Sequence, residues 1–367
     1  MVCLDYAATE PLSRFCSANH NQYLNPNAAY ALKERRLLER CEEAIKGAIG
    51  VNGGHVLYFR CATEAIKWLY NETNKRDGMW AHSPYEHDAC LFGVEGMPYG
   101  IPLSTVYYIH QWVNHITGEI FDLKSVKDQL SNGCHLVVDA TAGFGKAELP
   151  RDLDDIADAL FMSGHKIGCP ELSFMWLSDD LCEWLGATKD IRNQWGLHHG
   201  SLSVASVMAL TDAAEWACDE ERLVACQNEW LNLYWTMTEK FHDNSLHGFS
   251  INATVSGDRS NAGQPSSSTP AINAIRLNGI NADALQQFLA TKGIYVGIGG
   301  SACSDSKDFR VLRSCGLNDD EAAQVIRVSF GPETTVNDID SLVGAIVEYK
   351  NLFTTGNSSF KSGGDAE

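Results

Sequence analysis

The sequence has little positive charge: 28 Lys and Arg residues stand against 47 Asp and Glu residues, giving a net charge of -19 at pH 7. This balance argues against direct, non-specific binding to nucleic acid or to an anionic membrane, because both attract mainly Lys and Arg. No apolar run approaches the roughly 20 residues that span a bilayer. Residues 1–5 also lack the basic segment and long apolar core of a signal peptide. We therefore expect a cytoplasmic protein without direct membrane or nucleic-acid contacts.

The twelve cysteines include no Cys-x-x-Cys pair and no metal-finger spacing. In a chain of 367 residues this scatter is typical of reduced thiols and predicts neither a disulfide scaffold nor a metal site. Most of them are expected to be small core residues. Cys303 differs, because the residues before it (299–302) are small and those after it (304–308) are polar or charged. This setting favours an exposed, reactive thiol over a buried cysteine in a glycine-rich turn.

Short apolar strands alternate with amphipathic helices along most of the chain. Strands are predicted at residues 55–59, 78–82, 106–110, 134–138, 161–163 and 172–177, and helices at 28–50, from 60 onward, from 86 onward and over 201–243. Such alternation indicates an α/β fold, with a mainly parallel sheet covered by helices on both faces. We expect a large domain at 1–252, with an irregular arm at 1–27. A small α+β domain at 253–353 carries the Cys303 loop, and a flexible tail follows at 354–367.

A lysine and an aspartate follow two of the predicted strands. Lys166 comes directly after the apolar run at 161–163, where a desolvated amine can form a Schiff base; a solvated surface lysine is the alternative. Asp139 ends the strand at 134–138. Because open α/β sheets bind ligands at the carboxyl ends of their strands, we expect both side chains at one site. An acid and a lysine there suit pyridoxal 5'-phosphate, since the carboxylate keeps the ring nitrogen protonated and the amine holds the aldehyde.

Two weaker signals stand at predicted helix starts. Ala62 and Thr63 open the helix after the strand at 55–59, where backbone N–H groups and the helix dipole can hold a phosphate. A plain threonine near a helix start accounts for the same residues. His87 follows the strand at 78–82 and could lie over a planar cofactor or act as a half-buried cap.

Taken together, these stretches resemble the cysteine desulfurases, the aminotransferase class V enzymes of pyridoxal-phosphate fold type I. The matching segments, in chain order, are Leu4-Asp5-Tyr6-Ala7-Ala8-Thr9, Cys61-Ala62-Thr63-Glu64-Ala65, Glu86-His87, Val138-Asp139-Ala140-Thr141, Ser163-Gly164-His165-Lys166, Gly299-Gly300-Ser301-Ala302-Cys303-Ser304, Val311-Leu312-Arg313-Ser314-Cys315-Gly316-Leu317 and Ile326-Arg327-Val328-Ser329-Phe330-Gly331. Ordered matches over nearly the whole chain are far more specific than any one of them.

The resemblance implies the chemistry. Lys166 would bind the cofactor and shuttle a proton, Asp139 would pair with its ring nitrogen, and His87 would stack on its ring. The Cys303 thiolate would then attack the sulfur of L-cysteine, leaving a persulfide on Cys303 and releasing L-alanine. The persulfide sulfur would pass to an acceptor protein.

The resemblance also implies the binding residues. Thr63, with the backbone of Ala62, would hold the cofactor phosphate together with Ser163 and His165. Ser201 would reach the same phosphate from the other subunit of a homodimer.

The substrate carboxylate would pair with Arg327, whose planar fork of donors suits it, and Asn25 would assist. The sequence departs from the family pattern at several places. Ala142 replaces a glutamine that contacts the ring oxygen, and the usual Asn-Glu-x-Gly becomes Asn114-His115-Ile116-Thr117-Gly118, where either Asn114 or His115 could take the place of the asparagine. The usual Arg-Ser-Gly-Thr becomes His198-His199-Gly200-Ser201, which removes an arginine near the active site. These departures suggest a specialised branch.

The sequence constrains the destination of the sulfur less than it constrains the reaction. DNA phosphorothioation is the preferred expectation, while iron-sulfur cluster assembly and tRNA thiolation remain open. Other class V reactions, such as that of selenocysteine lyase or a transaminase, keep the cofactor, and transamination would not require Cys303. A catalytically weak scaffold is a third possibility, to which Ala142 gives some weight.

Overall fold

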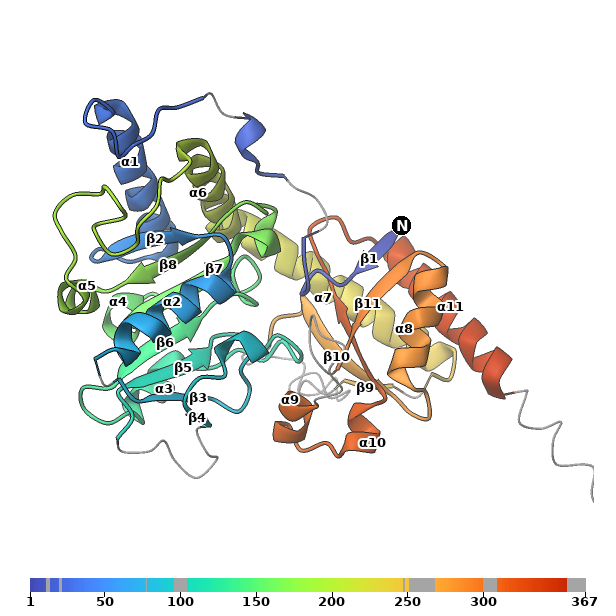
Figure 1. The fold of residues 1–367 in the computed structure, drawn as a ribbon. Helices are drawn as coiled ribbons and strands as arrows, with labels where there is room; N and C mark the ends of the chain where they lie inside the picture. Colours follow the sequence, from blue (N-terminus) through green and yellow to red (C-terminus); the bar gives the residue numbers. More distant parts are fainter. Residues whose placement is uncertain are drawn as a thin grey trace, which may run out of the picture. The chain divides into compact units, whose positions relative to one another are not determined.

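The computed structural model describes residues 1–10, 14–19, 22–76, 78–95, 104–246, 248–250, 268–299 and 309–354. The described chain packs into two compact units, which Figure 1 traces. The large unit comprises the described parts of 9–225 and 266–269. The small unit comprises those of 1–8, 226–265 and 270–367.

The large unit is built on a seven-stranded sheet. Its strands, from edge to edge, are β2 (His55–Phe59), β8 (Ser173–Leu177), β7 (Ala159–Ser163), β6 (His135–Asp139), β5 (Tyr107–Gln111), β3 (Trp80–His82) and β4 (Val94–Glu95). The strands from β7 to β4 are parallel, and β8 runs antiparallel to both of its neighbours. Every residue of β5, β7 and β8 is buried, as expected for a sheet covered on both faces. The predicted mainly parallel sheet is confirmed.

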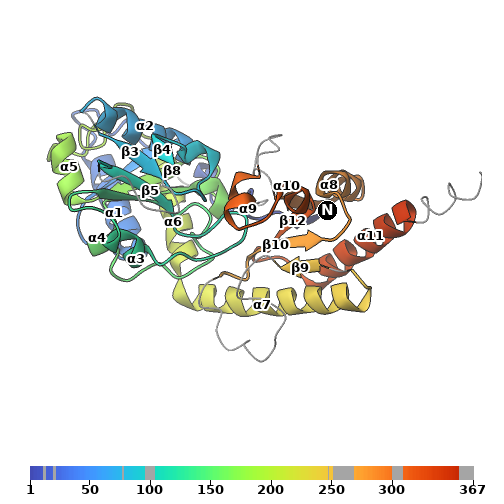
Figure 2. The ribbon, with the colours of Figure 1, turned by 90° about the horizontal axis from the view of Figure 1, so that it is seen from below.

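Helices lie on both faces of this sheet, and Figure 2 shows α2 on one side with α3 and α4 on the other. The helices of the large unit are α1 (Leu32–Ile49), α2 (Ala62–Asn74), α3 (Leu123–Asp128), α4 (Leu153–Ile156), α5 (Asp179–Leu185) and α6 (Val204–Cys218), with 3-10 turns η1 (Ser17–Asn19), η2 (Asp88–Cys90) and η3 (Gly164–Ile167). In the described part of the chain, no helix is long and apolar enough to cross a membrane.

Two predicted helices differ from the structure. The helix expected from residue 86 is only the single turn η2. The helix expected over 201–243 is interrupted at Asp219, whose backbone is extended, so that α6 ends at Cys218 and α7 (Glu220–Asp243) begins after it. Arg222 stabilises this break by donating to the carbonyl groups of Trp216, Ala217 and Gly145. The two helices share one apolar pattern, which hides the interruption in the sequence.

The small unit is built on a five-stranded sheet. Its strands are, in order, β1 (Val2–Leu4), β11 (Ile294–Ile298), β12 (Val325–Ser329), β10 (Ile272–Leu277) and β9 (Gly248–Ser250). Its helices are α8 (Ala282–Thr291), α9 (Arg310–Ser314), α10 (Asp319–Ala322) and α11 (Val336–Thr354), together with the part of α7 from Cys226. Only β1 and β11 are parallel neighbours; the other pairs are antiparallel.

The start of the chain is more regular than the sequence indicates. Residues 1–27 were expected to form an irregular arm, yet Val2–Leu4 is a strand of the small unit and pairs with β11. The domain boundary predicted after residue 252 stays a prediction, whereas the two compact units are discontinuous in sequence. The predicted tail lies almost wholly outside the described residues, which end at 354.

At the amino edge of the large sheet, a hydrogen-bonded cluster around Asp158 has a structural role. Asp158 accepts hydrogen bonds from Lys127 Nζ, His135 Nδ1 and the Leu136 amide, each at 2.8 Å. Burial raises the pKa of Asp158, but these donors outweigh it and hold the pKa below its ordinary value. The opposite, carboxyl edge carries the candidate site.

Candidate active site

Four predicted site residues follow parallel strands at one edge of the large sheet. Asp139 ends β6, Lys166 lies in η3 directly after β7, His87 follows β3, and His115 follows β5. Because these strands are parallel, their carboxyl ends meet at the same edge. The fold therefore gathers residues that are up to 79 positions apart, between His87 and Lys166.

The Asp139 carboxylate is buried and oriented. The residue is 7% exposed, and its Oδ1 accepts from the Thr141 amide at 2.8 Å. Its Oδ2 accepts from the Cys90 thiol at 3.6 Å. Sequence reasoning missed Cys90, because this thiol belongs to η2 and nothing local connects it with β6.

The carboxylate of Glu86 lies beside this pair. Glu86, Cys90 and Asp139 bring one ligand atom each to within 4.8 Å of one another, a spacing compatible with a metal ion. However, Glu86 Oε1 already accepts from Ser83 Oγ at 2.6 Å and from the Gln111 amide at 2.7 Å. Hydrogen bonds thus account for the position of each carboxylate without a metal.

Two histidine rings lie together at this edge. The rings of His87 and His115 are 5.3 Å apart between centroids and inclined at 65°. His87 Nδ1 accepts from the Ala89 amide at 3.1 Å, so this histidine does cap the following turn. His115 Nδ1 lies 3.1 Å from Gln111 Oε1. Because an amide oxygen only accepts, His115 Nδ1 carries a proton, and in the neutral ring Nε2 is then an acceptor.

Asn114 is fully buried next to His115. Its Oδ1 accepts from the amides of Ile116 and Thr117, at 2.9 and 3.1 Å. Its Nδ2 has no hydrogen-bond partner among the residues that the structure describes. A buried donor without an acceptor is costly, so an acceptor oxygen on a bound group fits this position.

The amino end of α2 lies at the same edge. Strand β2 is antiparallel to β8, which is antiparallel to β7, so β2 points in the same direction as β7. Two residues separate the end of β2 from the start of helix α2, and the second of them, Cys61, is an extended N-cap that makes no side-chain capping hydrogen bond. The amides of Ala62 and Thr63 in the first turn have no helical acceptor, which suits an anion.

The turn that carries Lys166 is closely packed. Ser163 Oγ lies 2.8 Å from His165 Nδ1, and the Glu10 amide donates to the His165 carbonyl at 3.0 Å. A Cβ atom on Gly164 would lie 2.0 Å from the carbonyl oxygen of Leu172, so only glycine fits there. These contacts fix the backbone from which the half-buried Lys166 side chain extends.

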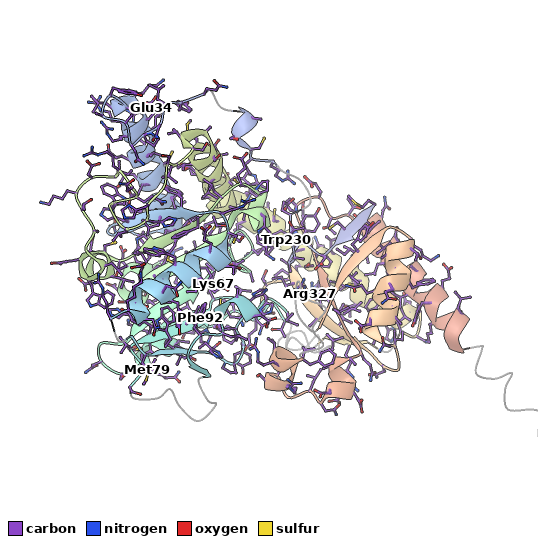
Figure 3. All side chains as sticks on the ribbon, in the orientation of Figure 1. Glu34, Lys67, Met79, Phe92, Trp230 and Arg327 are labelled. Carbon is purple, nitrogen blue, oxygen red and sulfur yellow. The ribbon has the colours of Figure 1, made fainter. Side chains whose placement is uncertain are left out.

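The remaining predicted residues belong to other segments of the chain. Asn25 Nδ2 donates to Ser201 Oγ at 3.0 Å, and both residues are exposed in the large unit. Arg327, labelled in Figure 3, belongs to β12 of the small unit and is fully buried against Asp5. The expected grouping of Asn25 with Arg327 therefore stays a prediction. Cys303 lies outside the described residues.

Comparisons with known proteins agree with this arrangement. The NifS protein of Bacillus subtilis (strain 168) is 26% identical over 385 residues, covering 94% of this chain and 93% of the relative. The cysteine desulfurase IscS 1 of Archaeoglobus fulgidus is 25% identical over 389 residues, covering 94% and 95%. The solved structure of a NifS-like protein superposes with a TM-score of 0.77 at 21% identity, covering 96% of this chain and 100% of that one. These likenesses confirm the α/β aminotransferase fold.

The apo structure of a cysteine desulfurase from Thermococcus onnurineus also superposes, with a TM-score of 0.71 at 15% identity and coverage of 96% and 95%. The model of the aminotransferase class V family matches residues 93–342, which include Asp139, Lys166 and Arg327. The chain therefore belongs to the aminotransferase class V family.

Proposed function

We propose that the protein is a pyridoxal 5'-phosphate-dependent cysteine desulfurase. The observation that carries this proposal is the gathering of Asp139, Lys166, His87 and Asn114 at one sheet edge, beside the first-turn amides of α2. Aminotransferase class V enzymes depend on this cofactor in general. Relatives at about 25% identity over most of the chain are named cysteine desulfurases.

The residues present fit the cofactor ring. The oriented carboxylate of Asp139 would hold a proton on the ring nitrogen, and the His87 ring would stack on its face. Asn114 Nδ2 would donate to the ring oxygen. We favour Asn114 over His115 for this contact because a phenolate oxygen needs a donor, while the second nitrogen of a neutral His115 is an acceptor. The methyl group of Ala142 cannot supply a donor in place of the family's glutamine.

The phosphate would be held at the amino end of α2. Ala62 and Thr63 offer amides there, and Thr63 adds a hydroxyl. Ser163 and His165, already in contact at 2.8 Å, would complete the cradle. Ser201 of a second copy would add a further hydroxyl.

Bound at this edge, the cofactor would supply an electron sink for cleavage of a carbon–sulfur bond. Arg327 would bind the substrate carboxylate, with help from Asn25, whose amide is held by Ser201. The Lys166 amine would move a proton to and from the substrate carbon atoms. The Cys303 thiolate would form a sulfur–sulfur bond with the substrate as the carbon–sulfur bond breaks. The overall reaction, L-cysteine plus thiol to L-alanine plus persulfide, is balanced without an external oxidant.

Absorption spectroscopy of the purified protein tests this proposal. We expect a visible band from protein-bound pyridoxal phosphate, a change in that band on addition of L-cysteine, and one L-alanine formed per sulfur released in the presence of a thiol reductant. A colourless protein that cannot be reconstituted with the cofactor would point to a scaffold. Formation of 3-mercaptopyruvate without sulfur release would instead indicate transamination, since the amino group would then stay on the cofactor while the sulfur stays on the substrate carbon.

A homodimer is part of this proposal. Ser201 and Asn25 are exposed, and the nearby segment that leads into α1 exposes the large apolar side chains of Leu24, Tyr30 and Leu32. Exposed apolar groups of this size favour contact with another chain. Light scattering should therefore give about twice the chain mass of 40.3 kDa.

The sulfur would pass to an acceptor protein, because a net charge of -19 disfavours direct contact with nucleic acid. DNA phosphorothioation remains our proposed destination, and transfer of labelled sulfur to candidate acceptors would separate it from iron-sulfur assembly and tRNA thiolation. No disulfide joins the eleven cysteines that the structure describes, which supports the proposed location in the reducing cytoplasm.

A further inference from the structure

The guanidinium group of Arg327 contacts a carboxylate, that of Asp5, which the sequence did not predict as its partner. Arg327 is 0% exposed on β12, and its Nη2 donates to Asp5 Oδ1 at 2.7 Å. Asp5 follows directly after β1 and is separated from Arg327 by 322 positions. A buried guanidinium without a negative partner is strongly disfavoured, so this contact governs where the group lies in the folded unit.

The backbone around Asp5 is fixed to the end of β12. Asp5 forms a parallel bridge with Ser329, and Ser329 Oγ accepts from the Ala7 amide at 2.8 Å. Two residues further, a Cβ atom on Gly331 would lie 2.0 Å from the Tyr6 ring. The Gly331 carbonyl also accepts from Trp230 Nε1 of α7 at 3.0 Å, with Trp230 labelled in Figure 3. These contacts therefore fix the backbone that carries the Asp5 carboxylate.

Gly297 lies close to the edge of the Arg327 guanidinium that Asp5 contacts. It lies opposite Arg327 in the register of β11 and β12. A Cβ atom at Gly297 would be 2.9 Å from Arg327 Nε, 2.9 Å from Arg327 Nη2 and 2.9 Å from Asp5 Oδ1. The Gly297 backbone and the Asp5 carboxylate therefore both lie against the Nε–Nη2 edge of the Arg327 guanidinium.

We infer that Asp5 is a positioning residue that sets the orientation of Arg327 for the substrate carboxylate. This inference rests on the proposed function. An arginine binds a carboxylate best when its planar fork is fixed before the ligand arrives, because the ligand then does not have to order it. Asp5 holds Nη2 of that fork and Gly297 limits its tilt. If the negative charge of Asp5 instead competed with the substrate carboxylate, its removal would lower KM, and the experiment separates these two effects.

Replacing Asp5 with Ala tests the inference. We expect the KM for L-cysteine to rise by about tenfold with kcat nearly unchanged, because the contact with the carboxylate stabilises the bound substrate and the transition state equally. Asp5→Asn keeps an acceptor oxygen at the same place and should restore most of the affinity. Gly297→Ala, which leaves Asp5 intact but pushes on the guanidinium, should raise KM in the same way.

Two inhibitors give a readout besides turnover. L-Alanine carries the carboxylate, and ethylamine is the same molecule without it. In Asp5→Ala, the inhibition constant of L-alanine should rise in parallel with KM, while that of ethylamine stays unchanged. The matched control is Glu321→Ala, which breaks the 2.7 Å contact between Glu321 and Arg276 on neighbouring strand β10. We expect no change in either inhibition constant there.

Several outcomes would overturn the inference. A KM below the wild-type value in Asp5→Asn would show that Asp5 competes with the substrate carboxylate. Equal rises in the inhibition constants of L-alanine and ethylamine in Asp5→Ala would show that Asp5 has only a structural role. An unchanged KM in both Asp5→Ala and Gly297→Ala would also contradict it. If the wild-type protein neither turns over L-cysteine nor binds L-alanine, the proposed function fails together with the inference. If the wild-type protein turns over L-cysteine normally, a failed prediction in the variants contradicts only the role of Asp5.

Discussion

Replacement of Lys166 by Ala is expected to lower kcat/KM for L-cysteine by at least about 10³-fold, which corresponds to roughly 4 kcal/mol in the activation barrier. Lys166 is proposed both to anchor the cofactor and to move the proton, so both functions disappear together. The visible band of the bound cofactor should also be lost or displaced. Absorption spectra and alanine formation, recorded on the same samples, measure the two effects.

The matched control is Lys124→Ala, because the side chain of Lys124 is 67% exposed on α3 and lies outside the proposed site. It should leave both the spectrum and the turnover unchanged. The turn around Lys166 is held by Ser163, Gly164 and Glu10 through contacts that do not involve the amine, so the variant should still fold. Turnover that survives in Lys166→Ala would refute the proposed role.

Replacement of Cys303 by Ser should produce a different pattern of loss. Sulfur release from L-cysteine is expected to fall by about 10³-fold, because a hydroxyl is a much weaker nucleophile toward sulfur than a thiolate. The cofactor band should stay, and L-cysteine should still change it, since no cofactor contact is assigned to Cys303. Persulfide detected by mass spectrometry on the wild-type protein, and its absence from the variant, would complete the test.

Cys315→Ser is the control for that experiment. Cys315 is half-buried at the end of α9, twelve positions after Cys303, and no role in sulfur transfer is proposed for it. Its replacement should leave persulfide formation intact. If Cys303→Ser and Cys315→Ser behave alike, another thiol or a direct release of sulfide must carry the reaction.

Six of the seven strands of the large sheet were predictable because they are short apolar runs with clear ends, whereas the two-residue β4 was not predicted. The run ending at Asp139 and the run before Lys166 are buried on both faces, so each reads as a parallel strand without any alternation. Strand direction then placed both side chains at one edge. Local patterns and chain direction were sufficient for this part of the candidate site.

Contacts between distant segments could not be predicted in this way. The carboxyl partner of Arg327 is Asp5, and no local pattern indicates a pairing over 322 positions. Cys90 approaches Asp139 only because η2 and β6 end at the same edge. The amide orientation of Asn114 depends on a turn whose two donors, Ile116 and Thr117, are visible only in the folded chain.

The pairing of β1 with β11 also bears on the order in which the chain can fold during synthesis. All seven strands of the large sheet are complete by Leu177, whereas β1 has no neighbour until Ile294–Ile298 has been made. The large unit can therefore form first, while the first residues wait as an unpaired strand. Asp5 meets Arg327 only after β12 emerges, so the proposed binding site for the substrate carboxylate is among the last features of the molecule to form.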